Sequence, residues 1–126
     1  MKTKVRSTTI KHTPVNEKKA IRIFKARIEK GIKYLDKRMK REDWLKRLNP
    51  ITLNLEQDDV CVCGQVFGSY FSAFGYDKES GAQYGFFVEP GFLGSTDGHE
   101  NWFWDLLGYM WAKKLVELKH KNGFKN

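Results

Sequence analysis

Cys61 and Cys63 are the strongest nucleophiles in this chain of 126 residues, and a single residue separates them. That spacing is strained for a disulfide and lacks the second pair of ligands that a structural zinc site needs. Cys61 could be a nucleophile at the start of a helix, where the helix dipole lowers a thiol pKa. The carboxylates of Asp58 and Asp59 oppose this, because nearby negative charge raises the pKa of a thiol. We therefore expect two reduced thiols buried as packing residues, no metal site, and no enzymatic activity, with a Cys61-dependent reaction as the residual alternative.

Other groups that could do acid/base chemistry lie further along the chain. His99 and Glu100 precede Trp102 and Trp104 and could form an acid/base pair beside an aromatic pocket. We expect instead the solvated polar start of a helix, since a histidine in that place needs no function. Asp105 is acidic within an apolar stretch, so it either caps a pocket or, as we expect, pairs with a basic side chain. No catalytic residue and no cofactor is predicted.

The most distinctive charged feature is a row of basic residues near the N-terminus. Apolar residues recur at steps of three and four along residues 17–40 and predict one stripe of a helix, made of Ile21, Phe24, Ile28, Ile32, Leu35 and Met39. At 100° per residue the opposite face is almost purely cationic and holds Lys19, Arg22, Lys30, Lys33 and Lys37. Like charges at these spacings repel one another, and phosphate groups would supply the missing counter-charge. A solvated helix face is the equally weighted alternative.

Charge is distributed unevenly along the chain, whose net charge is +8. Residues 1–48 hold 17 basic and 5 acidic residues (+12), residues 49–112 hold 1 and 9 (−8), and residues 113–126 hold 5 and 1 (+4). Both ends are therefore basic and the middle is acidic. The apolar runs are far shorter than the roughly 20 residues of a membrane span, and no secretion signal is evident. We expect a cytoplasmic protein that does not enter a membrane.

The remaining segments predict a helix-rich domain with a small sheet. After Pro50, the alternation of Ile51, Leu53 and Leu55 favours a strand or an extended segment, and residues 83–89 form the best strand candidate. Helical spacing predicts a short helical turn over residues 42–48, one helix over residues 61–74 and a last helix over residues 99–120, while Asn16 is a plausible N-cap for the first. The expected fold class is α+β: one helix-rich domain with a two- or three-stranded sheet and long N- and C-terminal helices. We expect residues 1–16 to form a flexible basic arm, residues 17–121 the domain and residues 122–126 a tail.

The last predicted helix is apolar on two faces. Trp104, Leu107, Trp111, Leu115 and Leu118 form one stripe, while Trp102, Leu106 and Tyr109 form another on nearly the opposite side. A helix of this kind lies at the centre of a core or contacts something beyond it. We expect Trp102, Leu106 and Tyr109 to form the interface of a homodimer or higher homo-oligomer.

Residues 31–112 resemble a group of small, mostly uncharacterised proteins of bacteriophages and some bacteria. The similar residues are Tyr34-Leu35-Asp36, Trp44, Ile51 to Leu55, Tyr84-Gly85-Phe86, Trp104 to Trp111 and, as the most specific part, the decapeptide from Cys61 to Tyr70. Cys63 stands where an aliphatic residue is usual in that group. The resemblance implies a phage setting and action by binding, because small accessory phage proteins commonly act that way; it implies no particular activity.

We therefore expect a non-enzymatic binding protein that acts stoichiometrically on a host protein, such as a defence protein, or sequesters a nucleotide-type ligand. Phosphate would meet the basic side chains, and a pocket formed by the glycine- and aromatic-rich segments 64–76 and 84–92 would hold the rest of the ligand. The expected ligand-binding residues are Arg22, Lys30, Lys33, Lys37, Gln65, Tyr70, Tyr84 and Phe86. The alternative is a nucleic-acid-binding accessory protein that uses the basic N-terminal arm and the first helix.

Overall fold

The computed structural model describes residues 14–94 and 100–124, and in this part of the chain the fold is helical. The helices are α1 (Pro14–Arg38), α2 (Arg41–Arg47), α3 (Val62–Phe67), α4 (Tyr70–Phe74), α5 (Lys78–Gln83), the 3-10 turn η2 (Phe92–Gly94) and α6 (Glu100–Lys121). No strand forms in the described residues, so the expected α+β class with a sheet is wrong. No helix there is long and apolar enough to cross a membrane.

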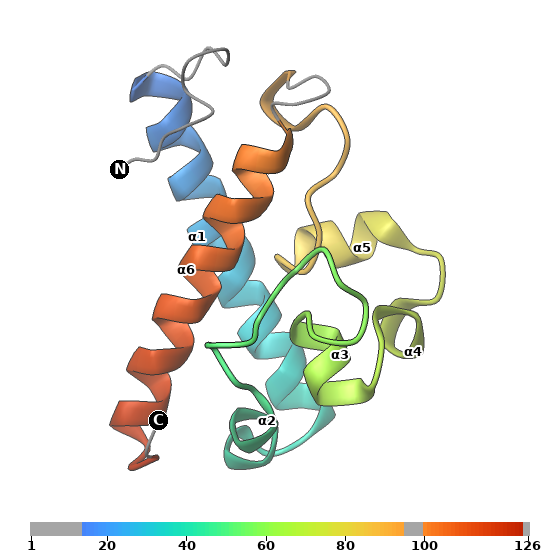
Figure 1. The fold of residues 1–126 in the computed structure, drawn as a ribbon, viewed down its shortest axis with the longest axis vertical. Helices are drawn as coiled ribbons and strands as arrows, with labels where there is room; N and C mark the ends of the chain where they lie inside the picture. The colour runs from blue at the N-terminus through green and yellow to red at the C-terminus, as the bar shows by residue number, and fades with distance from the viewer. Residues whose placement is uncertain (1–13, 95–99, 125–126) are drawn as a thin grey trace.

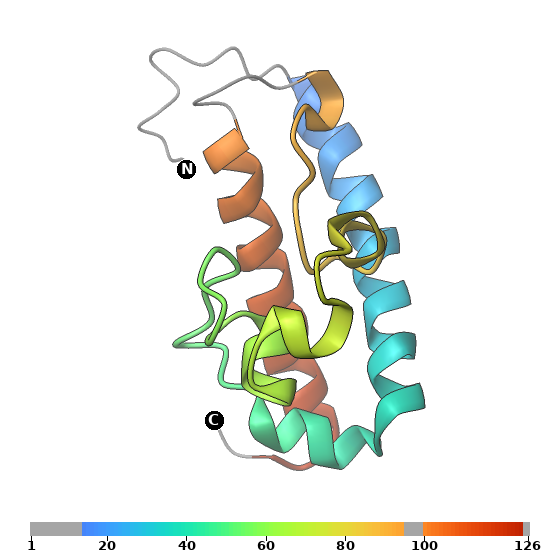
Figure 2. The ribbon, with the colours of Figure 1, turned by 90° about the vertical axis from the view of Figure 1, so that its right-hand side faces the viewer.

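The two long helices, α1 and α6, lie side by side and run in the same direction (Figure 1). Parallel neighbours need a long connection, and residues 39–99 supply it. The short helices of this connection pack across one side of the α1 and α6 pair (Figure 2). A close approach between the long helices occurs at Gly31, where an added Cβ would lie 3.0 Å from the Trp111 ring and 2.2 Å from the Tyr84 carbonyl oxygen.

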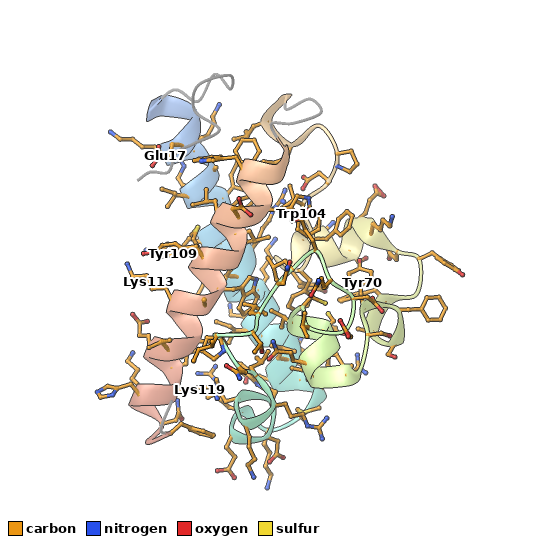
Figure 3. All side chains as sticks on the ribbon, in the orientation of Figure 1. Glu17, Tyr70, Trp104, Tyr109, Lys113 and Lys119 are labelled. Atoms are coloured by element: carbon orange, nitrogen blue, oxygen red, sulfur yellow. The ribbon has the colours of Figure 1, made fainter. Side chains whose placement is uncertain are left out.

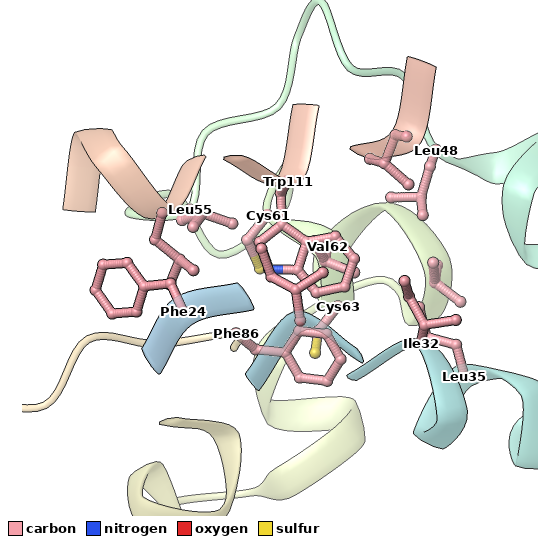
Figure 4. Close-up of a cluster of buried hydrophobic side chains, with 14 of the residues drawn as sticks. Phe24, Ile32, Leu35, Leu48, Leu55, Cys61, Val62, Cys63, Phe86 and Trp111 are labelled. Atoms are coloured by element: carbon pink, nitrogen blue, oxygen red, sulfur yellow. The ribbon is translucent and has the colours of Figure 1, made fainter. Parts of the chain in front are cut away.

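Trp111 of α6 lies at the centre of the core, close to both α1 and the connection. Its ring stacks on Phe86 with centroids 5.7 Å apart, and its indole N–H donates to the carbonyl oxygen of Gly85 at 2.6 Å. Both thiols lie in the same cluster of buried side chains (Figure 4). Of the stripe predicted on the last helix, Leu107, Trp111, Leu115 and Leu118 are buried and Trp104 is half-buried. Of the stripe predicted on the first helix, Phe24, Ile28, Ile32 and Leu35 are buried, Met39 is half-buried and Ile21 is exposed.

Residues 51–55, expected as a strand or an extended segment, and residues 83–89, the best strand candidate, form no strand. Asn49 and Asn54 accept backbone N–H groups two residues ahead, which makes turns of residues 49–56 and leaves Ile51 85% exposed. In residues 83–89 the alternation is real, with Phe86 and Val88 buried, but it reflects packing on helices. The backbone amide of Phe86 donates a hydrogen bond to the Gly81 carbonyl oxygen, and Gly85 has a φ of 76°. A period of two therefore marks alternating burial here without strand pairing.

The predicted helix over residues 61–74 is two helices. Cys61 caps α3, since its Sγ accepts the Gly64 amide at 3.3 Å, and Ser69 caps α4. Between them Gly68 has a φ of 100°, a backbone conformation that breaks the helix. The N-cap of α3 is thus Cys61 and not the preceding Asp58 or Asp59.

The start of α1 also differs from the expectation. The helix begins at Pro14, a residue suited to the first helical position, so Asn16 lies within the helix and does not cap it. The flexible arm expected for residues 1–16 lies outside the described residues as far as residue 13, and its last three residues are helical. The other bounds agree closely, since α2 and α6 end within one residue of the predicted positions.

Candidate functional site

The outward face of α1 is basic and exposed, as its periodicity predicts. It is formed by Lys19, Arg22, Lys30, Lys33 and Lys37, which all face solvent. None of these cations makes an ion pair or hydrogen bond with another residue in the described part of the chain. We call these five residues the basic face. At 1.5 Å per residue they extend over about 27 Å of the helix.

Two acidic residues of α1, Glu29 and Asp36, pair with residues outside the basic face. The Glu29 carboxylate lies 3.4 Å from the Lys114 ammonium on α6. The Asp36 carboxylate accepts Arg41 at 2.7 Å and the indole N–H of Trp44 at 2.9 Å. Partial burial raises the pKa of Asp36, but the hydrogen bonds from Arg41 and Trp44 outweigh it and leave this pKa below its usual value. Glu29 and Asp36 are thus paired with cations of α6 and α2, and neither forms an ion pair with the basic face.

A cavity of about 300 Å³ opens where the connection meets α6. Tyr70 from α4, Phe87 from the segment after α5 and Trp104 from α6 line it, and the buried side chain of Phe86 also contributes. Carboxylates of Glu56 and Asp58 stand at the same cavity and are themselves exposed. Figure 3 shows Tyr70 and Trp104 on the side of α6 that faces the connection. We call this cavity the aromatic cleft.

Of the expected ligand-binding residues, only Tyr70 and Phe86 line the aromatic cleft. The side-chain amide of Gln65 is used within the fold, since it accepts the Asn49 amide and donates to the Val60 carbonyl at 2.9 Å. Tyr84 stacks on Tyr34 with ring centroids 5.0 Å apart. The basic side chains expected to meet phosphate lie on the outward face of α1 and do not line this cavity.

Other cleft residues, Glu56 and Trp104, were not predicted as ligand-binding, and Phe87 lies in the predicted pocket segment 84–92 without having been singled out. They come from separate segments, and each looks ordinary in the sequence. Phe87 belongs to an aromatic pair in which the neighbouring Phe86 is buried. No local spacing distinguishes the ring that faces a cavity from the ring that faces the core, so only the tertiary contacts identify these residues.

Both cysteines are buried free thiols, as predicted. Burial raises the pKa of Cys61, and the nearby Asp58 carboxylate raises it further, while the amide of Gly64 acts in the opposite direction. Burial likewise raises the pKa of Cys63. A thiol with a raised pKa holds little thiolate at neutral pH, so the environment of these cysteines disfavours nucleophilic chemistry.

The expected oligomer contact lies on another side of α6. Trp102 and Leu106 are half-buried and Tyr109 is 64% exposed. Leu106 and Tyr109 border a groove of about 480 Å³ between α1 and α6, to which Ile21 also contributes. Figure 3 shows Tyr109 and Lys113 on the side of α6 away from Tyr70. Self-association through this surface stays a prediction, which light scattering at high protein concentration would test.

The remaining candidates concern metal binding and acid/base chemistry. Among the described residues, no three His, Cys, Asp or Glu side chains are grouped so as to hold a metal ion. His99 of the possible acid/base pair lies outside the described residues, and only the backbone of Glu100, at the start of α6, is described. Asp105 is exposed on α6.

Comparisons with protein-family models, curated proteins and solved structures give no match. The resemblance to small phage proteins therefore stays a prediction.

Proposed function

We propose that this protein binds the phosphodiester backbone of a nucleic acid through the basic face of α1. One observation carries the proposal: Lys19, Arg22, Lys30, Lys33 and Lys37 lie exposed on one side of a single helix, without ion pairs in the described structure. A solvent-exposed helix face ordinarily alternates the two signs of charge. A regular row of phosphates is the partner whose charge and length match such a face.

The placement of the acidic residues strengthens this proposal. Glu29 and Asp36 could each have lain beside a basic neighbour, but they pair with Lys114 and Arg41 instead. Residues 1–13 contribute further cations by sequence, namely Lys2, Lys4, Arg6 and Lys11. Contacts with phosphate groups do not distinguish one base from another, so we expect binding with little sequence preference.

A nucleotide-type ligand held in the aromatic cleft is less well supported by the geometry. Its phosphate would lie close to the carboxylates of Glu56 and Asp58, and among the described residues Lys78 alone contributes a basic side chain to the cleft lining. The expected residues Lys30, Lys33 and Lys37 line a different surface. Stoichiometric inhibition of a host protein stays a prediction that no contact in the structure favours or opposes.

The proposal is tested by fluorescence anisotropy with labelled duplex DNA, duplex RNA and single strands over a series of salt concentrations. Contact by all five cations gives a slope of log K against log salt of about −4.5 on duplex DNA. We expect the Lys30→Glu, Lys33→Glu, Lys37→Glu triple variant to bind at least about tenfold more weakly, because attraction becomes repulsion at three positions. The DNA and RNA arms identify which polymer is preferred.

A matched control is the triple variant Lys46→Glu, Lys113→Glu, Lys121→Glu. These lysines are exposed and lie off the basic face, so the variant has the same net charge as the test variant. We expect it to retain most of the affinity. Equal losses in the two variants would show an unspecific effect of net charge, and an unchanged affinity of the first variant would overturn the proposal.

A further inference from the structure

The aromatic cleft has the composition of a site for a positively charged organic group. Its walls are the rings of Tyr70, Phe87 and Trp104. Phe87 and Trp104 meet edge to face, with centroids 5.0 Å apart and an interplanar angle of 86°, and Tyr70 lies 6.1 Å from Phe87. Rings at such angles present more than one face to a shared space, and the face of an aromatic ring carries negative potential.

Two carboxylates add net negative charge to the same space. Asp58 accepts the backbone amide of Tyr70 through Oδ1 at 2.9 Å, which fixes this carboxylate beside the aromatic wall. The Glu56 carboxylate makes no hydrogen bond or ion pair with another described residue. Among the described lining residues Lys78 is the one cation, so together these residues carry a formal charge of −1.

A cation already lies on one of these rings. The ammonium nitrogen of Lys78 stands 5.5 Å from the centroid of Phe87. Lys78 is exposed and forms no ion pair within the described part of the chain. The ring face of Phe87 is therefore accessible to an ammonium group, and the flexible lysine side chain can move out of the cleft.

We propose that the aromatic cleft binds an organic cation, namely an alkylated ammonium group on a short stem. The aromatic faces attract the charge without forming hydrogen bonds, which suits a methylated ammonium that has few or no N–H donors. Glu56 and Asp58 supply the counter-charge, and a cavity of about 300 Å³ is large enough for such a group. The site is separate from the basic face and independent of nucleic-acid binding.

The experiment is an NMR titration of the full chain with choline, followed through the indole N–H signal of Trp104 as assigned with a Trp104→Phe variant. Its uncharged isostere, 3,3-dimethylbutan-1-ol, has the same shape without the charge. We expect choline to bind roughly threefold to thirtyfold more tightly than this alcohol. Equal affinities would overturn the proposal, since apolar burial alone would then explain binding. Adenosine monophosphate serves as the aromatic anion, and its binding in preference to choline would also overturn it.

Substitution of Lys78 gives opposite results for a cationic and an anionic ligand. We expect Lys78→Met to strengthen choline binding severalfold, because the competing ammonium is removed from the Phe87 ring. Weaker binding in this variant would contradict a cation site. Glu56→Gln should weaken choline binding severalfold, and the matched control Glu79→Gln, an exposed carboxylate of α5 outside the cleft lining, should leave it unchanged.

Substitution of Glu56 or Lys78 is expected to change ligand binding without changing the fold. Glu56, Lys78 and Glu79 are all exposed, so their substitution leaves the core intact, and an unchanged NMR spectrum outside the cleft verifies this. None of them belongs to the basic face. If Glu56→Gln bound choline more weakly and kept its affinity for DNA, the effect would therefore belong to the cleft alone.

Discussion

The basic face of α1 and the aromatic cleft are built in opposite ways. The basic face comes from one helix, and its residues are related by the helical period alone. The cleft combines residues from four separate segments, with Glu56, Tyr70, Phe87 and Trp104 separated by many positions in the chain. One surface is positive and lacks partners in the described structure, whereas the other has net negative charge and is bordered by buried side chains. A surface on one element tolerates changes elsewhere in the fold, and a site assembled from several segments depends on all of them.

The largest expected difference between these two regions follows from Gly64→Ala. An added Cβ would lie 2.3 Å from the carbonyl oxygen of Asp58 and 2.8 Å from the Cα of Asp59. Both are backbone atoms, so the chain itself would have to shift to relieve the clash. We expect the free energy of unfolding to fall by about 1–3 kcal/mol, measured by urea denaturation. The displaced Asp58 should also weaken ligand binding in the cleft, while the folded variant keeps its nucleic-acid affinity.

Gly108→Ala is the matched control for that variant. Here the new Cβ would meet only Leu55 side-chain atoms, at 3.8 Å and 3.9 Å, which is ordinary contact distance. Because alanine favours a helix over glycine by up to about 1 kcal/mol, we expect unchanged or raised stability. Equal destabilisation of both variants would contradict a specific close approach at Gly64.

An intermediate effect on stability is expected at the ion pair between Arg27 of α1 and Glu89, which follows the cleft residue Phe87 in the chain. Arg27 donates two hydrogen bonds to Glu89, each at 2.8 Å, and its guanidinium also lies over the Phe92 ring. The hydrogen bonds from Arg27 hold the pKa of Glu89 below its ordinary value, against the opposing effect of partial burial. A carboxyl with a lowered pKa stabilises the fold above its unfolded pKa, about 4.3, and this contribution is lost as the pH falls through the folded pKa.

Glu89→Gln tests this pair. Since the carboxylate is partly exposed, we expect a loss of only about 0.5–1 kcal/mol at neutral pH. The variant should also lose less stability than the unsubstituted protein as the pH falls below about 4.3, because the titrating group is gone. Urea midpoints over a pH series measure both effects, and parallel acid profiles would contradict the assignment to Glu89.

The smallest effect on stability is expected on the basic face. Replacing Lys30, Lys33 and Lys37 by Gln removes repulsion between like charges at helical spacing, worth a few tenths of a kcal/mol for each pair. We expect a slightly raised midpoint of thermal unfolding together with weaker nucleic-acid binding. A stability loss above about 1 kcal/mol would show that these lysines serve packing, and would erase the contrast with the cleft.

The sequence predicted the long helices well because periodicity over many residues is a strong signal. Ile28, Ile32 and Leu35 are buried as expected, and Lys30 and Lys33 face solvent. The wrong predictions of secondary structure concern short segments. Ile51 alternates with polar residues as in a strand, but the side chains of Asn49 and Asn54 turn the backbone instead. Local alternation is satisfied equally by a strand and by an extended segment laid on helices, so it does not distinguish them.

The sequence by itself determined the basic face, because a helix places its side chains by a fixed rotation per residue and needs no information from elsewhere. It also determined that Cys61 and Cys63 would be buried. Only the tertiary structure decided that Glu29 and Asp36 pair with residues outside the basic face, and that Phe87 and Trp104 meet Glu56 at a cleft. Contacts between distant segments depend on how helices pack, and packing is set by the whole set of buried side chains, not by any one stretch of the chain.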